Sequence, residues 1–440
     1  MRTTRVSSAA ELLDALASAD DIEVDGLVTG MPMITLRPGT TLRGGTLRFG
    51  AKGIRLSVGN TLADITILVP DHEVAISNDT SVADFGTLTL RKVHTRGQVL
   101  VLAEDEVRTG HVIVDGLTVV SADLRGRTRR QHAFGVDAMP GAFTVWNRQP
   151  DPASRITASL TGISAGAADS PVRGSGAYIA GRPGGGTVEV DVLRTGPVFA
   201  DGGIEPGTPD LISGGVFVVS GARVDTVVND GPVTTFGAND MVLDNWGEVG
   251  TWTARAPVTS HGPSAIGFVQ FGVLGRLDVQ APITTHGAGA RGFNVYDGRL
   301  GSARFRRIVT HGDGAIGIQI SRDVPDVEIV EDVTTAGGLG ASLVKGVQTP
   351  LRAIAVSIKP EGRIRTLTVG GSLRTGGDEV ITLDVEGALE SLTVRGGITA
   401  TGTGSVAVRA AGSIAGLDEI SVTAPHGLAM DSGENRGAAV

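Results

Sequence analysis

A pattern of apolar, polar and glycine positions repeats every 25 residues through the C-terminal half of the chain. Its rows begin at Val233, Val258, Ile283, Ile308 and Val333 and, after one row of 40 residues, at Leu373 and Ile398. The eleventh position is always apolar: Leu243, Phe268, Phe293, Ile318, Leu343, Leu383 and Val408. The fifth position is always glycine: Gly237, Gly262, Gly287, Gly312, Gly337, Gly377 and Gly402. A fixed period of this kind predicts one structural unit per row, stacked on its neighbours.

Each row predicts two or three short strands joined by tight turns. The density of glycine and of β-branched residues excludes short helical repeats. A row is then one coil of a parallel β-helix, with successive coils about 4.8 Å apart, and the rule for parallel crossovers makes the helix right-handed. We expect the glycine column to mark a bend with positive φ. The predicted fold is an all-β, single-stranded, right-handed parallel β-helix of about 25 residues per coil.

The N-terminal half also predicts short strands separated by turns, but without a strict 25-residue period. It begins with one helix. In "SSAAELLDALASA", Ser8 and Glu11 have the spacing of a capping box. Leu12, Leu13 and Leu16 are expected to form the apolar face of this helix. An N-terminal capping helix within residues 5–20 would cover the open end of the first coil, as a solenoid requires.

The composition agrees with one large β domain. Glycine accounts for 65 of the 440 residues and hydrophobic residues for 41 %, which indicates many turns around a core rather than disorder. The expected organisation is a single domain over residues 1–430, a long loop excursion at 122–160, an insertion between coils at 345–360 and a flexible tail at 431–440.

Charge and residue usage exclude several classes of function. The net charge of −9 leaves no basic stripe for nucleic acid. Cysteine is absent, which removes disulfides and thiolate chemistry. No apolar run is long enough to span a membrane, and the first residues lack the apolar region of a secretory signal. We therefore expect a cytoplasmic protein, with export by a non-classical route as the open alternative.

The N-terminal coils carry a resemblance to a known superfamily. The stretches "SSAAELLDALASADDIEVDGLVTG", "ITLRPGTTLRGG" and "GIRLSVGNTLADITI" resemble the entry into pectate-lyase-like right-handed β-helices, over roughly residues 7–70. That superfamily includes polysaccharide lyases, glycoside hydrolases, uronate epimerases, fructotransferases and viral tailspikes. The resemblance implies carbohydrate handling by analogy of fold, because no catalytic residue lies inside it.

Alternation along the strand places one set of side chains on the outer surface. With position 11 inward, positions 10, 12 and 14 should point outward. Position 10 is small in most rows, and the other two positions supply the candidate substrate-binding residues Asn294, Gln319, Trp246, Phe271 and Tyr296, beside Asp244. A ledge of rings beside polar groups suits a sugar chain. The same stripe also suits a subunit interface, as in a homotrimer, or local packing under the long loop.

The excursion at 122–160 is rich in arginine. Arg129, Arg130 and His132 are candidates for binding the carboxylate or sulfate groups of an acidic sugar. Long excursions on a solenoid tend to be functional. The alternative is a solvated, mobile loop.

Three carboxylates are candidates for catalysis at a glycosidic bond, which needs two acids. Asp240 and Asp244 should lie about 13 Å apart on one extended strand. Asp297 lies two coils beyond Asp244, about 10 Å away along the axis. Neither separation suits the chemistry well, and a pair completed across a subunit interface remains open.

The pentapeptides "VTSHG", "ITTHG" and "IVTHG" align three histidines, His261, His286 and His311, in one column. A straight ladder does not favour the converging ligands of a zinc site, so we interpret it as a stacked, mostly neutral surface ladder. We expect no resident cofactor. Calcium is the one candidate, at the acidic stretches "PDH" and "EDEV".

Together these features favour a carbohydrate-active enzyme that binds a glycan along the outer face of the β-helix. Such an enzyme would be a lyase, a glycoside hydrolase or a transferase. The alternatives are a non-enzymatic glycan-binding or adhesion β-helix, and a homotrimeric structural β-helix with the aromatic ladder as its interface.

Overall fold

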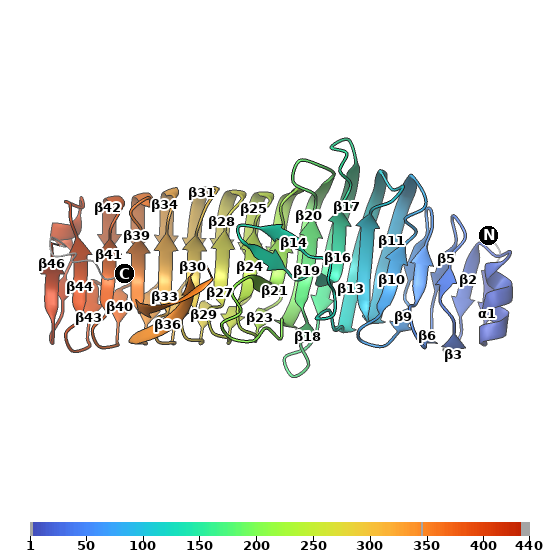
Figure 1. Ribbon diagram of the computed structural model, residues 1–440, viewed down its shortest axis with the longest axis horizontal. Coiled ribbons are helices and arrows are strands. Elements are labelled where there is room, and N and C mark those ends of the chain that lie inside the picture. The colour runs from blue at the N-terminus through green and yellow to red at the C-terminus, as the bar shows by residue number, and fades with distance from the viewer. Residues whose placement is uncertain (1–2, 345, 433–440) are drawn as a thin grey trace.

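The computed structural model describes residues 3–344 and 346–432, and these form a right-handed parallel β-helix (Figure 1). Strands make up 59 % and helix 3 %, which confirms the predicted all-β class. Residues 433–440, most of the tail expected to be flexible, lie outside the described part. Within the described residues, no helix has the length and apolarity needed to cross a membrane.

The strands form three faces, each running along the solenoid. The site face consists of β4 (Ile34–Thr35), β7 (Ile54–Leu56), β10 (Val74–Asn78), β12 (Gln98–Ala103), β16 (Gly141–Asn147), β19 (Ser175–Ala180), β21 (Leu211–Val218), β24 (Asp240–Asn245), β27 (Ile266–Gln270), β30 (Arg291–Val295), β33 (Ile316–Ile320), β38 (Ile354–Ile358), β41 (Ile381–Val385), β44 (Val406–Ala410) and β46 (Leu428–Asp431).

The long-strand face consists of β1 (Thr3–Val6), β2 (Asp21–Val24), β5 (Thr41–Arg43), β8 (Thr61–Ala63), β11 (Asp84–Arg96), β13 (Thr109–Ser121), β17 (Arg155–Ala165), β20 (Thr187–Asp201), β22 (Ala222–Asn229), β25 (Glu248–Ala254), β28 (Val273–Val279), β31 (Arg299–Phe305), β34 (Asp323–Ile329), β39 (Arg363–Val369) and β42 (Ala388–Val394). The short-strand face consists of β3 (Leu27–Met31), β6 (Thr46–Phe49), β9 (Thr66–Leu68), β18 (Val172–Arg173), β23 (Val233–Thr235), β26 (Val258–Ser260), β29 (Ile283–Thr285), β32 (Ile308–Thr310), β35 (Val333–Thr335), β40 (Leu373–Thr375), β43 (Ile398–Ala400) and β45 (Val422–Thr423).

The 25-residue period is the register of the stack. Val233 lies opposite Val258, and Val258 lies opposite Ile283, in parallel pairs of the short-strand face. The pairing continues through the later rows to Ile398. Each position of a row therefore contacts the same position of the next row. This is why the columns of the sequence become ladders of side chains in the structure.

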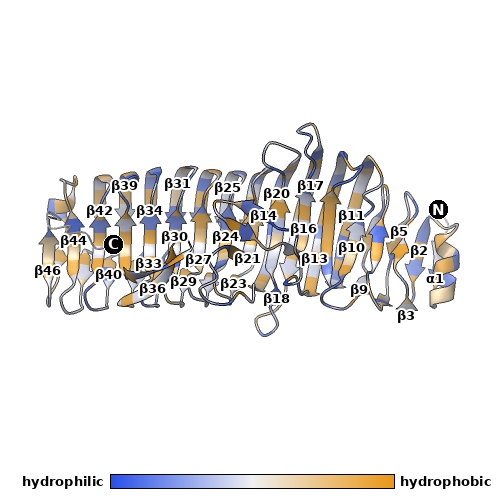
Figure 2. Cartoon of the chain, viewed as in Figure 1, coloured by the Kyte–Doolittle hydropathy of each residue, from blue (hydrophilic) through white to orange (hydrophobic). Residues whose placement is uncertain are grey.

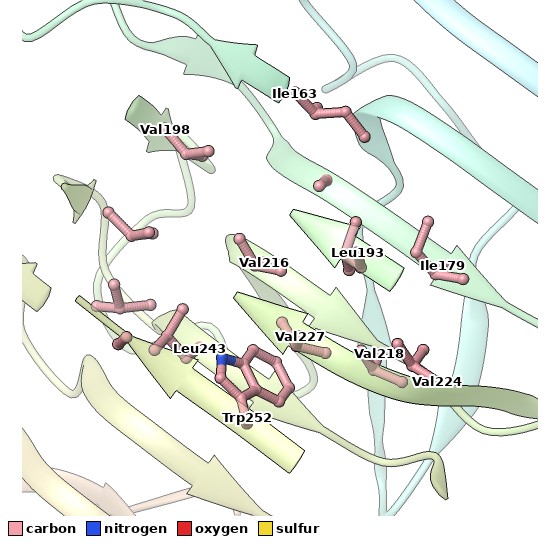
Figure 3. Close-up of a cluster of buried hydrophobic side chains, with 14 of the residues drawn as sticks. Ile163, Ile179, Leu193, Val198, Val216, Val218, Val224, Val227, Leu243 and Trp252 are labelled. Carbon is pink, nitrogen blue, oxygen red and sulfur yellow. The ribbon is translucent and has the colours of Figure 1, made fainter. Parts of the chain in front are cut away.

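The eleventh position points into the interior, as predicted. Leu243, Phe268 and Phe293 are fully buried in a core that extends from Val6 to Leu417. Leu243 lies with Trp252 of the long-strand face in this core (Figure 3). Along the strands in Figure 2, hydrophobic and hydrophilic bands follow one another, as alternation of inward and outward side chains requires.

The prediction that position 10 faces outward is wrong. A Cβ added to Gly267 would lie 2.4 Å from a methyl group of Ile283 in the core, and Gly292 has the same relation to Ile308. Positions 10 and 11 thus both face the interior, and the small residue leaves room for the β-branched side chain of the short strand. Position 9, occupied by Met241 and Ile266 among others, takes the outward place.

The glycine column owes its composition to close packing rather than to positive φ, so that prediction is also wrong. None of its members is among the glycines with positive φ. Instead, a Cβ on Gly262 would lie 1.8 Å from the carbonyl oxygen of Gly237, and one on Gly287 would lie 1.8 Å from that of Gly262. The bend brings successive backbones too close for any side chain.

The N-terminal end is covered by α1 (Ala9–Leu16), which follows β1. Ser8 caps it by accepting from the Glu11 N–H, and the Glu11 carboxylate accepts from the Ser7 N–H. Leu12 is buried against the first coils, but Leu13 is 44 % exposed. The predicted apolar face is therefore wrong at Leu13, because Ala15 takes that buried place. Near the other end lies one 3₁₀ turn, η1 (Leu417–Glu419).

Two hairpins interrupt the series of coils. The first, β14 (Gln131–Ala133) and β15 (Val136–Ala138), belongs to the excursion expected at 122–160, although β16 and the start of β17 within that range are ordinary coil strands. The second is β36 (Leu339–Val344) and β37 (Val347–Arg352). Because Ile354 pairs with Ile316, the insertion precedes β38 instead of occupying 345–360. Val356 accordingly takes the eleventh position in place of Leu343.

Candidate functional site

The two hairpins lie over the site face (Figure 1). Together with this face they line a cavity of about 310 Å³. The hairpin β14–β15 is fixed by parallel pairing of Asp137 and Ala138 with β21. The hairpin β36–β37 is fixed where the Leu343 N–H donates to Ser264 Oγ over 3.0 Å. Residues of both hairpins, among them Phe134 and Leu343, line the cavity opposite β24, β27 and β30.

Asp244 lies on the site-face side of this cavity, where the repeat places it on the outer side of β24. It is only 1 % exposed, and neither carboxyl oxygen accepts a hydrogen bond from any residue that the structure describes. Burial raises the pKa of Asp244 well above its usual range. The nearby indole N–H of Trp246 acts in the opposite direction on the pKa, although it does not reach hydrogen-bond geometry. The raised pKa favours the protonated form of this side chain on the cavity lining.

Three aromatic rings stand on successive coils beside Asp244. The ring centroids of Trp246 and Phe271 are 6.2 Å apart, and Phe271 stacks on Tyr296 at 5.1 Å. The arrangement follows from the repeat, since all three occupy position 14. The ledge is not open, however: Phe134 of β14–β15 stacks on Phe271 at 4.5 Å and meets Trp246 edge-on. Phe271 and Tyr296 still line the cavity.

Asp297 lies on the same cavity with the opposite electrostatic character. Its carboxylate accepts from the backbone N–H of Gly298 and from Arg322 Nε, the latter over 3.0 Å. These two contacts lower the pKa of Asp297. Asp244 and Asp297 thus share one cavity, two coils apart, with pKa values displaced in opposite directions.

Asp240 is not part of this cavity lining. It is fully buried, and its carboxyl accepts from Ser213 Oγ over 2.5 Å and from the Gly237 N–H over 2.7 Å. Burial raises its pKa to about 7, against the effect of these hydrogen bonds. The structure places it as a brace between neighbouring coils at the glycine bend.

Asn294 and Gln319 follow Asp244 in the same column, as predicted from the repeat. Asn294 is fully buried, and neither its side-chain oxygen nor its nitrogen has a partner among the described residues. Gln319 is 7 % exposed and accepts from Arg291 Nε over 3.3 Å. Neither side chain lines the cavity itself.

The predicted arginine cluster is largely neutralised by the chain. Arg129 and Arg148 both donate to Glu104, over 2.7 and 2.5 Å. Arg130 donates to the carbonyl oxygen of Arg127, and His132 contacts Asp137 across the hairpin at 2.9 Å. Arg129 and Arg148 line a second cavity, of about 290 Å³, between the excursion and β12, and Arg130 and His132 do not.

Arg291 and Phe134 are the cavity residues that the sequence reasoning missed. Arg291 begins β30 at position 9, lines the cavity and is 2 % exposed. The repeat could have identified Arg291, because it is the charged residue in an otherwise apolar column at position 9. The other members of this column are Met241, Ile266, Ile316, Ile354 and Ile381. Phe134 is a lone large apolar residue inside a polar segment.

The three histidines of the repeat lie away from the cavity lining. His261, His286 and His311 stack in parallel, with ring centroids 4.9 Å apart at each step, and Phe236 extends the stack at 5.1 Å from His261. This is the stacked ladder that the spacing predicted. Within the described residues, no group of three or more histidine or acidic side chains converges on a metal position.

The two acidic stretches proposed for calcium are engaged by other side chains. Asp71 of "PDH" accepts from Arg96 Nε over 2.6 Å and from Ser121 Oγ over 2.5 Å. Glu104 of "EDEV" holds the two arginines of the excursion. The carboxylates of Asp71 and Glu104 are thus committed to protein contacts.

Comparison with protein-family models, with characterised proteins and with solved structures finds no match. The cavity brings together a buried acid with a raised pKa, an acid with a lowered pKa, stacked aromatic rings and a buried guanidinium.

Proposed function

We propose that this chain is a carbohydrate-active enzyme that cleaves a glycosidic bond of a saccharide bound in the cavity, with Asp244 as the general acid. The observation that carries the proposal is the carboxyl of Asp244, which is buried, unpartnered and on the cavity lining. A carboxylic acid held neutral by an apolar site is the group that protonates a leaving oxygen in this chemistry.

Asp297 is the second acid that the reaction needs. Its pKa is lowered, so it is ionised and suited to activate a water molecule. Asp244 and Asp297 are two coils apart, an offset of about 10 Å along the axis. That axial offset exceeds both the ~5–5.5 Å of retaining enzymes and the ~6.5–9.5 Å of inverting enzymes. We therefore propose hydrolysis and leave its stereochemical course to the product analysis below.

The rest of the lining supports a sugar as ligand. Phe271 and Tyr296 line the cavity with aromatic surface against which the apolar face of a sugar can pack. Asn239 adds an amide at the wall. The cavity of about 310 Å³ is at the small end of ligand sites, which favours a short saccharide or a chain end over the middle of a polymer.

The test is turnover of a panel of aryl glycosides and of neutral and acidic oligosaccharides by the full chain. New reducing ends without absorbance near 235 nm would indicate hydrolysis, and NMR of the first product would report its anomeric form. Asp244→Asn, which keeps the shape of the side chain, should lower kcat by about 100-fold or more. Asp326→Asn, at an exposed ion pair with Arg365, is the matched control.

Equal rates in Asp244→Asn and the unaltered protein would contradict the assignment of Asp244. A product absorbing near 235 nm would make the enzyme a lyase. Saccharide binding without turnover would favour a glycan-binding protein that uses the same cavity.

A further inference from the structure

The guanidinium of Arg291 is the one cationic group buried on the cavity wall without an acidic partner among the described residues. It is 2 % exposed. Its Nε donates to Gln319 Oε1 over 3.3 Å, and Nη1 donates to the Gly289 carbonyl and to Ser342 Oγ over 3.3 and 3.2 Å. These acceptors are all neutral, and Nη2 has no hydrogen bond to the described residues.

A buried guanidinium whose hydrogen-bond partners are all neutral is electrostatically unfavourable. Arginine stays charged at any accessible pH, so burial cannot be relieved by loss of its proton. A buried charge without a counter-charge is costly, and such groups are normally paired. Asp297 on the same wall is already bonded to Arg322. A counter-charge for Arg291 would thus come from a bound molecule.

Anchoring of the hairpin β36–β37 does not account for the charge. Ser342 Oγ already donates to the Gly289 carbonyl over 2.9 Å, and the Leu343 N–H is held by Ser264. These bonds fasten the hairpin between neutral groups. An uncharged side chain at position 9, as in the other rows, would pack there at lower cost.

We propose that Arg291 binds an anionic substituent, a carboxylate, sulfate ester or phosphate ester, of the molecule that occupies the cavity. That this molecule is an acidic saccharide rests on the function proposed above. Arg291 lies on β30 and Asp244 on β24, so the anionic group sits two coils from the acid. The planar guanidinium suits such oxygens. In the excursion, Glu104 and Asp123 engage Arg125, Arg129 and Arg148, while Arg127 and Arg130 donate to backbone carbonyls.

The test uses small anions, because they require no knowledge of the sugar. Melting temperatures of the full chain are measured in acetate, sulfate and phosphate against chloride at constant ionic strength. At least one anion should raise the melting temperature saturably, by about 1–3 °C. Arg291→Gln should abolish that rise, while Arg306→Gln, at an exposed pair with Glu331, should keep it.

An anion response that persists in Arg291→Gln would overturn the proposal, and so would the absence of any saturable response in the unaltered protein. If Arg291→Gln does not fold, Arg291→Lys replaces it. Lysine keeps the charge but loses the planar fork, so its apparent affinity should fall about tenfold. Unchanged affinity would also overturn the proposal.

Two further variants separate this inference from the proposed function. Ser342→Ala removes the contact between Arg291 and the hairpin and should keep the anion response. Loss of the anion response in this variant would show that Arg291 is a structural anchor. Asp244→Asn should keep the response even though it lacks the catalytic acid. If the unaltered protein shows the anion response but no glycosidase activity, the anion site is supported and the proposed enzymatic function is contradicted.

Discussion

The ring of Phe134 in the hairpin β14–β15 stacks on Phe271 of the site face, with centroids 4.5 Å apart and planes 26° apart. Phe134 is itself 47 % exposed, so it covers its partner while one side remains in water. Both rings line the cavity. The contact joins an element outside the repeat to a ladder inside it, and it closes one side of the candidate site.

Phe134→Ala should weaken binding in the cavity more than it weakens the fold. The stacked pair contributes about 0.5–1.5 kcal/mol beyond its buried area, so we expect affinity for a bound saccharide or anion to fall about three- to tenfold. The melting temperature should change little because the ring is half exposed. Titration calorimetry measures the first and circular dichroism the second, with Leu428→Ala, another exposed apolar residue, as control. Unchanged affinity would mean that the hairpin does not close the site.

Asp244 should make the protein less stable as pH rises. Its folded-state pKa is raised above the unfolded value. The protonated form is favoured by folding, so its full contribution is present below the unfolded pKa, about 3.9. Stability is then lost as pH rises from there through the folded pKa. Asp244→Asn cannot ionise, and we expect it to be more stable than the unaltered protein at pH 7.

The difference between Asp244→Asn and the unaltered protein should shrink towards pH 4 in denaturant titrations at several pH values. A variant that is less stable at pH 7 would show that Asp244 is ionised and held by contacts. The pH profile of kcat should also fall on its alkaline side as Asp244 loses its proton.

The histidine ladder predicts the opposite pH dependence. Burial, and then the neighbouring His261 and His311, lower the pKa of His286. The unfolded state therefore binds more protons than the folded state just below pH 6.5, and stability falls as pH drops through this range. Replacing His286 by Phe continues the stack that Phe236 begins and removes this titration. We expect a smaller loss of melting temperature between pH 7 and pH 5 than in the unaltered protein. An equal loss would show that the ladder does not contribute.

Gly287→Ala should destabilise the fold strongly. Its Cβ would lie 1.8 Å from the Gly262 carbonyl oxygen, so two coils would have to separate. We expect a loss of at least about 3 kcal/mol, at the upper end for overpacking. Gly50→Ala is the matched control because nothing lies within 4 Å of its Cβ position. Denaturant unfolding measures both, and similar stabilities would contradict the close-packing explanation of the glycine column.

The ladders of this protein could be predicted from the sequence because the coils repeat. In a parallel stack, each residue contacts the same position of the next row, so a column of the alignment is also a contact in space. Leu243 and Phe268 in the core, and Trp246, Phe271 and Tyr296 on the outside, follow from this relation. The alternation failed at position 10, where Gly267 and Gly292 face the interior, because the strand turns two successive residues inward.

The site depended on what lies outside the repeat. Arg291 meets Ser342 across 51 residues, and Phe134 meets Phe271 from a hairpin with no counterpart in other rows. No period relates these partners, so only the folded chain determines which side chains the hairpins cover. The same covering removes Asp244 from water and leaves Arg291 without a counter-charge. The sequence by itself determined the solenoid and the outward place of Asp244, because these rest on neighbours one coil apart. The tertiary structure alone decided that this place is a covered cavity wall, because burial is a property of all the elements packed around a group.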